Sequence, residues 1–167
     1  MSSCRKKHCY CCSNCTSNSC YCTTSRPSGS SVLPAFGSLR KESGQVIDVD
    51  ETKVDYDFVG PSANVTLSIV NDTITINESG VYEISMSLTL GINPTDLARG
   101  FLFVNDVPLH FSAVSLTVTS NTLALATVSK TIQLELLAND VIDVRIHKVG
   151  DSVIVGSSSL TINRIGQ

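Results

Sequence analysis

Residues 80–90 alternate between apolar and polar side chains, and this stretch sets the pattern for the rest of the chain. Its apolar side chains are Tyr82, Ile84, Met86, Leu88 and Leu90. Between them lie the polar side chains Glu83, Ser85, Ser87 and Thr89. Because successive side chains of a β-strand point to opposite faces, this period of two predicts a half-buried strand near the middle of a sheet.

The chain after Gly44 repeats this pattern in short runs of Val, Ile, Leu and Thr, which Asn, Asp, Gly and Pro interrupt. Strands are expected at residues 32–39, 45–49, 54–59, 64–70, 73–76, 80–90, 101–104, 109–111, 114–118, 123–136, 141–149 and 153–165. The first is expected at a sheet edge, because Pro34 has no N–H to donate. Roughly ten strands without a convincing helix predict an all-β, ten-stranded jelly-roll sandwich.

The composition fits one such domain. The chain has 167 residues, 42% apolar and 5% aromatic, with no Trp, so Val, Ile and Leu must fill the core. We assign residues 32–167 to the jelly-roll domain and residues 1–31 to a Cys-rich tail with a Ser/Pro/Gly linker. Ligand pockets usually contain more aromatic side chains than this composition offers.

The charge is divided unevenly along the chain. Residues 1–31 carry four basic and no acidic side chains, and the remainder carries 8 basic and 15 acidic ones, which gives +4 and −7. The basic cluster at residues 5–7 is too short to predict nucleic-acid binding. No apolar run is long enough for a membrane span or a secretory signal, so synthesis in the cytosol is expected.

The acidic side chains are densest in one segment, at Asp48, Asp50, Glu51, Asp55 and Asp57. Five carboxylates in ten residues offer oxygen ligands for calcium. The spacing of an EF-hand loop is missing, which favours a solvated acidic edge instead.

The tail contains every cysteine of the chain: Cys4, Cys9, Cys11, Cys12, Cys15, Cys20 and Cys22. The pattern Cys-x4-Cys-Tyr-Cys occurs at residues 4–11 and again at residues 15–22. Because the number is odd, at least one thiol per chain is left for another chain or a metal. All seven are candidates for intermolecular disulfides, which would form after release from a reducing cytosol.

Two alternatives for the tail remain. Zinc would be held by Cys9, Cys12 and Cys15 with His8, although the short gaps of Ser, Asn and Thr lack the usual scaffold between ligand pairs. The tail would otherwise have no defined partner. The flexible composition favours cross-linking, because that needs no local fold.

No residues form a recognisable catalytic motif. The three histidines, His8, His110 and His147, lie far apart in the sequence, and no nucleophile elbow or phosphate-binding glycine loop accompanies them. His147 alternates with Arg145 and Asp143, which predicts a polar strand face. We therefore expect a protein without enzymatic activity, cofactor or metal site.

Three short motifs in residues 32–167 resemble one known family. They are Leu33-Pro34-Ala35-Phe36-Gly37, Gly80-Val81-Tyr82-Glu83-Ile84-Ser85 and Ser159-Leu160-Thr161-Ile162-Asn163-Arg164-Ile165. The chain is similar here to Bacillus exosporium proteins of the BxpB (ExsF) and BclA C-terminal-domain type. Those look like tumour-necrosis-factor (TNF) and complement globular-head domains, so the resemblance implies a TNF-like jelly roll.

The resemblance also implies a homotrimer on the spore surface, made in the mother-cell cytosol and oxidised later. Tyr82 is then expected on or near the interface between subunits, and apolar strand faces are expected to hold the trimer. The chain lacks the Gly-x-x tract of BclA, so it is not the hair-like filament. It is expected to be a basal-layer component, an anchor or a subunit of an endospore appendage fibre.

The resulting prediction is a structural exosporium protein. Its tail would cross-link it to other Cys-rich spore coat or exosporium proteins, or to the next trimer. The alternative is a trimeric adhesin-like module that recognises a sugar or a receptor. A surface cluster of aromatic side chains would favour that alternative, whereas the loops at residues 93–100 and 119–122 contain none.

Overall fold

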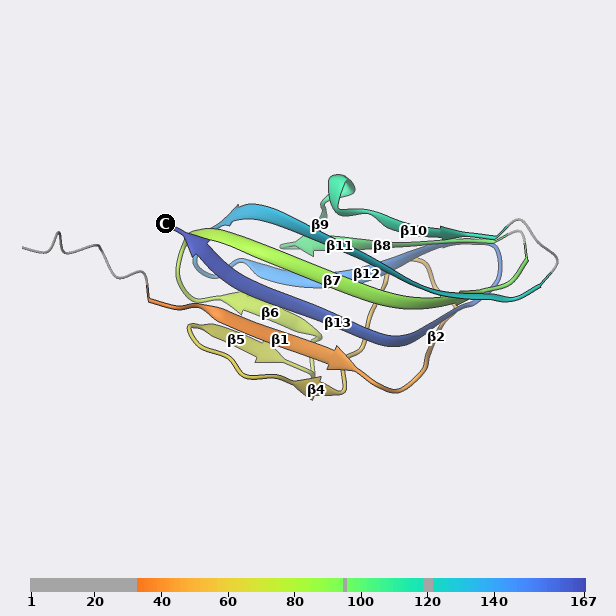
Figure 1. The fold of residues 1–167 in the computed structure, drawn as a ribbon, viewed down its shortest axis with the longest axis horizontal. Coiled ribbons are helices and arrows are strands. Elements are labelled where there is room, and N and C mark those ends of the chain that lie inside the picture. The colour runs from red at the N-terminus through yellow and green to blue at the C-terminus, as the bar shows by residue number, and fades with distance from the viewer. Residues whose placement is uncertain (1–32, 95, 119–121) are drawn as a thin grey trace, which may run out of the picture. The chain divides into compact units, whose positions relative to one another are not determined.

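The computed structural model describes residues 33–94, 96–118 and 122–167, which form a jelly-roll sandwich of two antiparallel sheets (Figure 1). The strands are β1 Phe36–Lys41, β2 Gln45–Ile47, β3 Thr52–Lys53, β4 Phe58–Val59, β5 Val65–Ser68, β6 Thr73–Ile76, β7 Gly80–Ile92, β8 Leu97–Val104, β9 Val107–Pro108, β10 Val114–Thr117, β11 Ala124–Leu136, β12 Val141–Val149 and β13 Val153–Gly166. One short 3-10 helix, η1, spans His110–Ser112. The described residues contain no helix long and apolar enough to cross a membrane.

The six-stranded sheet has the order β11-β7-β13-β1-β4, and β2 pairs with β13. The seven-stranded sheet has the order β10-β8-β12-β6-β5, with β3 on β12 and β9 on β8. Figure 1 shows the long strands β7, β11 and β13 running side by side. The predicted jelly-roll fold is thus confirmed.

Strand β7 lies in the interior of its sheet, as the alternation predicts. It pairs with β11 on one side and with β13 on the other, and its pairing with β11 covers all thirteen of its residues. The five apolar side chains of the alternating stretch are at most 1% exposed: Tyr82, Ile84, Met86, Leu88 and Leu90. They form the centre of the core between the two sheets.

The facing side of the core comes from β8 and β12. In β12 the buried apolar side chains are Ile142, Val144 and Ile146, and in β8 the inward positions include Gly100. A Cβ atom at Gly100 would lie only 2.2 Å from Cδ1 of Leu88. Gly100 therefore lets the two sheets approach closely, because any larger side chain would overlap Leu88.

The first strand is not the edge strand that Pro34 predicted. Strand β1 begins at Phe36, beyond the proline, and pairs with β13 along its whole length. Its other side pairs with β4 through Leu39 and Arg40. The proline thus precedes the sheet rather than marking its border.

The segment 54–59, predicted as one strand, instead crosses from one sheet to the other. The N–H of Val54 donates to the carbonyl of Val144 in the seven-stranded sheet, and the N–H of Asp57 donates to the carbonyl of Arg40 in the six-stranded sheet, both at 2.9 Å. Pairing with two different sheets interrupts the strand. The described residues contain thirteen strand segments, compared with the twelve candidate ranges and the ten-stranded sandwich expected from the sequence.

The predicted strand at residues 109–111 is replaced by η1. Asn105 and Asp106 adopt φ angles of 52° and 64°, which closes the β8–β9 hairpin within two residues. The buried hydroxyl of Ser112 accepts a hydrogen bond from the Leu102 N–H at 2.9 Å and donates to the Leu109 carbonyl at 2.6 Å. These bonds hold a turn where the sequence pattern predicted an extended chain.

Candidate functional site

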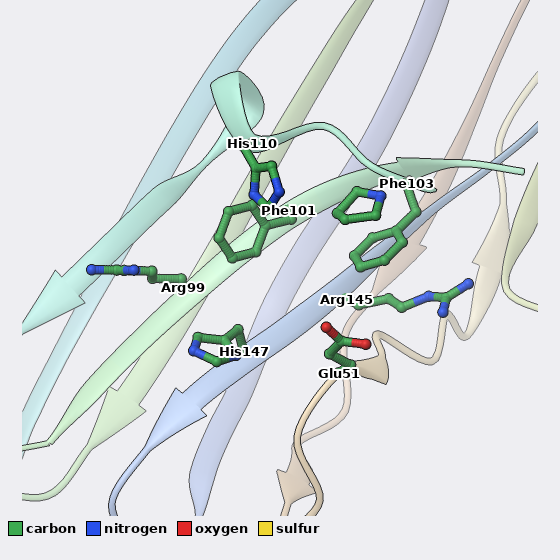
Figure 2. Close-up of a pocket in the computed structure, with 8 residues that line it drawn as sticks. Glu51, Arg99, Phe101, Phe103, His110, Arg145 and His147 are labelled. Atoms are coloured by element: carbon green, nitrogen blue, oxygen red, sulfur yellow. The ribbon is translucent and has the colours of Figure 1, made fainter. Parts of the chain in front are cut away.

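A pocket of about 230 Å³ lies on the outward face of the seven-stranded sheet (Figure 2). It is lined by Glu51, Arg99, Phe101, Phe103, Pro108, His110, Arg145 and His147. Most of these residues belong to β8 and β12, and Figure 2 shows their side chains on one side of the two strands. The pocket combines aromatic surface with groups of both charges.

The register of β8 and β12 brings these side chains together. Both strands alternate, so Arg99, Phe101 and Phe103 point outward from β8, opposite the buried Ala98 and Leu102. The antiparallel pairing then sets each outward residue of β8 opposite one of β12, as Arg99 with His147, Phe101 with Arg145 and Phe103 with Asp143. The polar face predicted for His147, Arg145 and Asp143 is therefore present.

Arg145 lines one side of the pocket and is held by ion pairs and an aromatic contact within the same chain. Its Nε lies 2.8 Å from Asp143 and its Nη2 also bonds Asp106, while its Cζ lies 4.3 Å from the centre of the Phe103 ring. The hydrogen bonds that Arg145 donates to the Asp143 carboxylate outweigh the effect of burial and hold the pKa of Arg145 above its ordinary value. Lys53 lies 3.0 Å from Asp143 and adds a second positive charge to this buried carboxylate.

An acidic loop supplies the opposite rim. Nδ1 of His147 lies 2.9 Å from one carboxylate oxygen of Asp50, and the N–H of Lys148 donates to the other at 2.9 Å. Burial raises the pKa of Asp50, but the backbone N–H groups of Lys148 and Glu51 together with His147 outweigh it and hold that pKa below its ordinary value. The loop is thereby fixed on β12, and Glu51, with a φ angle of 56°, lines the pocket.

The aromatic ring of His110, which also lines the pocket, belongs to η1. His110 approaches Phe101 with ring centres 6.0 Å apart and planes at 88°, and His147 approaches the same ring at 6.4 Å and 68°. Figure 2 shows His110 beside Phe101, on the side away from Glu51. Because Ser112 anchors η1 to β8, the position of His110 depends on that buried hydroxyl.

A second feature lies on the outward face of the six-stranded sheet. Its middle is lined with hydroxyl groups, since Ser85 and Thr89 of β7 face Thr131 and Thr127 of β11. The hydroxyl oxygens of these two pairs lie 2.8 and 2.9 Å apart. The polar face predicted for Ser85 and Thr89 is therefore confirmed, and the apolar faces expected to hold a trimer stay a prediction.

One end of the same face is apolar. The register aligns Leu125 of β11, Gly91 of β7, Ile154 of β13 and Val46 of β2 in one row across the sheet. Leu125, Ile154 and Val46 are 69%, 44% and 60% exposed. A Cβ atom on Gly91 would lie 3.5 Å from both Leu125 and Ile154, so these side chains flank Gly91 closely. We call Val46, Gly91, Leu125 and Ile154 the apolar row.

The residues singled out in the sequence have different positions. The disulfide candidates Cys4, Cys9, Cys11, Cys12, Cys15, Cys20 and Cys22 lie outside the described residues, as do His8 and residues 119–121 of the expected loop at residues 119–122. Tyr82 is fully buried in its own chain, and its hydroxyl donates to the Glu78 carbonyl at 2.6 Å. Its interface role stays a prediction, and the single chain offers none of its side-chain surface to a neighbour.

The acidic segment does not gather its carboxylates around one point. Asp50 bonds His147, Asp55 bonds Lys41, and Asp57 accepts hydrogen bonds from Ser43 and from the Glu42 N–H. In the described part of the chain, no group of three His, Cys, Asp or Glu side chains is placed to hold a metal ion. These carboxylates fasten loops to strands.

The aromatic-free loops do not predict this pocket, because its aromatic rings lie on strands and on the 3-10 turn. The alternation of Arg99, Phe101 and Phe103 was the available signal, since it sets aromatic rings on an outward strand face. The position of His110 could not be foreseen, because it depends on the 3-10 turn that replaces the expected strand.

Comparisons with known proteins define the fold more closely. No protein-family model matches the chain, and no curated protein sequence matches it. Among solved structures, Eiger TNF from S. frugiperda is similar with a TM-score of 0.61 and 16% identity, over 80% of this chain and 94% of that one. The globular domain of zebrafish complement 1qA protein gives a TM-score of 0.59 and 14% identity, over 81% and 99% of the two chains. The fold is thus of the TNF and complement globular-domain type.

Proposed function

We propose that this chain is a non-enzymatic structural protein of the spore surface that assembles as a homotrimer through the six-stranded sheet. The observation that carries the proposal is the apolar row at one end of a face whose middle carries paired hydroxyl groups. Exposed apolar surface of this kind marks interaction sites. The chain shares its fold with Eiger TNF and with the complement 1qA globular domain, which supports a TNF-like arrangement, and the choice of this face rests on the apolar row.

The trimer is tested by placing a charge in the apolar row. In Leu125→Glu, association would bury an unpaired carboxylate, so the full-length protein should sediment as monomer under reducing conditions. The control is Val70→Glu, which changes a side chain that is 87% exposed in the turn between β5 and β6 of the other sheet. A Leu125→Glu protein that remains trimeric at micromolar concentration would refute the assignment of this face.

The tail is proposed to cross-link each trimer to a Cys-rich coat or exosporium protein, or to a neighbouring trimer of an appendage. Replacement of all seven cysteines by Ser should abolish reductant-sensitive multimers on non-reducing gels of spore extracts. The melting temperature of the domain should stay nearly unchanged, because disulfides between chains close no loop within it. Early melting, or stoichiometric zinc released by a chelator, would favour the other uses of the tail.

The spore-surface location rests on the resemblance to exosporium proteins, and cell fractionation tests it directly. Antibody against the chain should label the surface of mature spores. Before release, the chain should be found reduced and soluble in the mother-cell cytosol. Labelling confined to vegetative cells would contradict the location.

A second candidate function is a binding module, and the pocket on the seven-stranded sheet favours it. Phe101, His110 and His147 form a surface aromatic cluster of the kind that favours this alternative, outside the loops at residues 93–100 and 119–122. This cluster lies over the seven-stranded sheet and the apolar row lies on the six-stranded sheet, so the two proposals use different faces of the chain. The two functions are therefore compatible in one protein.

A further inference from the structure

The pocket contains two charged groups without a partner in the described residues. Arg99 is exposed, and its guanidinium makes no hydrogen bond or ion pair there, and the same is true of the Glu51 carboxylate. By contrast, Arg145 is held by Asp143 and Asp106. Arg99 therefore supplies the free positive charge of the pocket, with five N–H donors in a planar fork.

The aromatic floor is suited to one flat apolar face. Phe101 is partly exposed, and both imidazoles meet it at steep angles rather than stacking on it. The Phe103 ring is already covered by Arg145. Arg145, which is paired with Asp143 and Asp106, already occupies the cation position on the Phe103 ring, and the unpaired guanidinium of Arg99 would repel an ammonium group placed close to it.

The volume of the pocket and its hydrogen-bonding groups restrict the class of ligand further. A volume of about 230 Å³ is below the roughly 300–1,000 Å³ typical of drug-sized ligands, which leaves space for one ring. Because Nδ1 of His147 bonds Asp50, its Nε2 is left for a ligand, and the imidazole of His110 lies on the other side of Phe101. With Glu51 as an acceptor, several hydroxyl groups of a ligand can be bonded.

We propose that this pocket binds a six-membered sugar ring that carries a carboxylate, as in a uronic acid unit of a polysaccharide. Arg99 pairs with the carboxylate, the C–H face of the ring lies on Phe101, and the hydroxyl groups meet His147, His110 and Glu51. An aromatic acid shares the flat ring and the charge but has no hydroxyl groups for these partners. The inference rests on the binding function proposed for this pocket.

The test is titration of the full-length protein, under reducing conditions, with D-glucuronate, D-glucose and benzoate. Binding is followed by NMR of the ring protons of His110 and His147, which lie on either side of Phe101. Glucuronate should shift both histidines with a Kd in the millimolar range, as suits a single sugar unit. Glucose and benzoate should bind at least tenfold more weakly, because glucose lacks the carboxylate and benzoate lacks the hydroxyl groups.

The matched variants are Arg99→Gln and Arg40→Gln. Both remove an exposed arginine, the first in the pocket and the second on β1 of the other sheet. Arg99→Gln should raise the Kd for glucuronate tenfold or more, and Arg40→Gln should leave it unchanged. Equal melting temperatures of the two variants show that the loss is not unfolding.

The outcomes separate the inference from the function on which it rests. If glucose binds as well as glucuronate, or benzoate binds better, the ligand class is wrong but the pocket remains a binding site. An equal loss in the two arginine variants would also overturn the role of Arg99. If none of the three ligands shifts either histidine, both the inference and the binding function of this pocket fall.

Discussion

Two buried tyrosines differ in whether their hydroxyl group is bonded, and this difference predicts opposite effects of the same substitution. The hydroxyl of Tyr82 donates to the Glu78 carbonyl at 2.6 Å. The hydroxyl of Tyr56 is buried without a hydrogen-bond partner in the described residues. Burial raises the pKa of both phenols, so each hydroxyl stays protonated around neutral pH.

The expected sizes follow from the hydroxyl groups alone. Tyr82→Phe removes a bond worth about 0.5–1.5 kcal/mol, so the free energy of unfolding should fall by about 1 kcal/mol. The Tyr56 hydroxyl is buried without a hydrogen bond, and burying such a group costs about 1–3 kcal/mol. Tyr56→Phe removes this cost, so the free energy of unfolding should rise by about 1 kcal/mol. Each change corresponds to a shift of roughly 2–8 °C in melting temperature, in opposite directions.

The assay is urea unfolding of the full-length variants by circular dichroism, at one protein concentration and with reductant. Equal m-values would show that the same surface unfolds in all three proteins. If Tyr56→Phe loses as much stability as Tyr82→Phe, the Tyr56 hydroxyl is bonded in solution and the reasoning fails. A loss above about 3 kcal/mol in either variant would indicate repacking rather than a hydroxyl effect.

Three further predictions concern the loops and the sheet contact. Backbone hydrogen bonds from Ser43 and Glu42 lower the pKa of Asp57 to about 2. The ionised Asp57 side chain therefore stabilises the fold fully above the ordinary aspartate pKa, near 3.9, and this stabilisation is lost as the pH falls toward 2. The melting temperatures of wild type and Asp57→Ala should therefore differ at pH 6 and converge near pH 2, and a constant difference would argue against this clamp. Gly100→Ala should lower the free energy of unfolding by about 1–3 kcal/mol because the new methyl group overlaps the buried Leu88, and an unchanged urea midpoint would contradict the close sheet contact. Ser112→Ala should cost about 1–3 kcal/mol by leaving the Leu102 N–H unpaired, and it should broaden the NMR signals of His110, whereas sharp, unshifted signals would show that η1 does not need this hydroxyl.

The sequence predicts the long strands well and the short ones poorly. In β7 and β12 the alternation continues for many residues, so the period of two determines both the strand and its buried face. Residues 54–59 and 109–111 have the composition of strands, but hydrogen bonds to distant segments divide the first and the Ser112 hydroxyl bends the second. Such bonds depend on the register of other strands, which local composition does not contain.

The candidate site can likewise be predicted only in part from the local sequence pattern. The polar face at Asp143, Arg145 and His147 follows from local alternation and was predicted. Its meeting with Phe101 and Phe103 requires the β8–β12 register, and the approach of Glu51 requires the bond between Asp50 and His147. The apolar row likewise combines residues from four strands that are separated in the chain.

Strand β11 ends the order of the six-stranded sheet, so thirteen residues of backbone on one side are open to pairing with a strand of another molecule. Lys130 lies in the middle of this strand, opposite Met86, on the side where Val128 and Ile132 point toward the core, and its exposed ammonium group donates to the Phe111 carbonyl. An inward-pointing charge on an outermost strand makes lateral strand addition costly, because the added strand would have to bury the ammonium group. A fibre built from this chain is therefore directed toward contacts between side chains or thiols, and amyloid-like templating along β11 is suppressed.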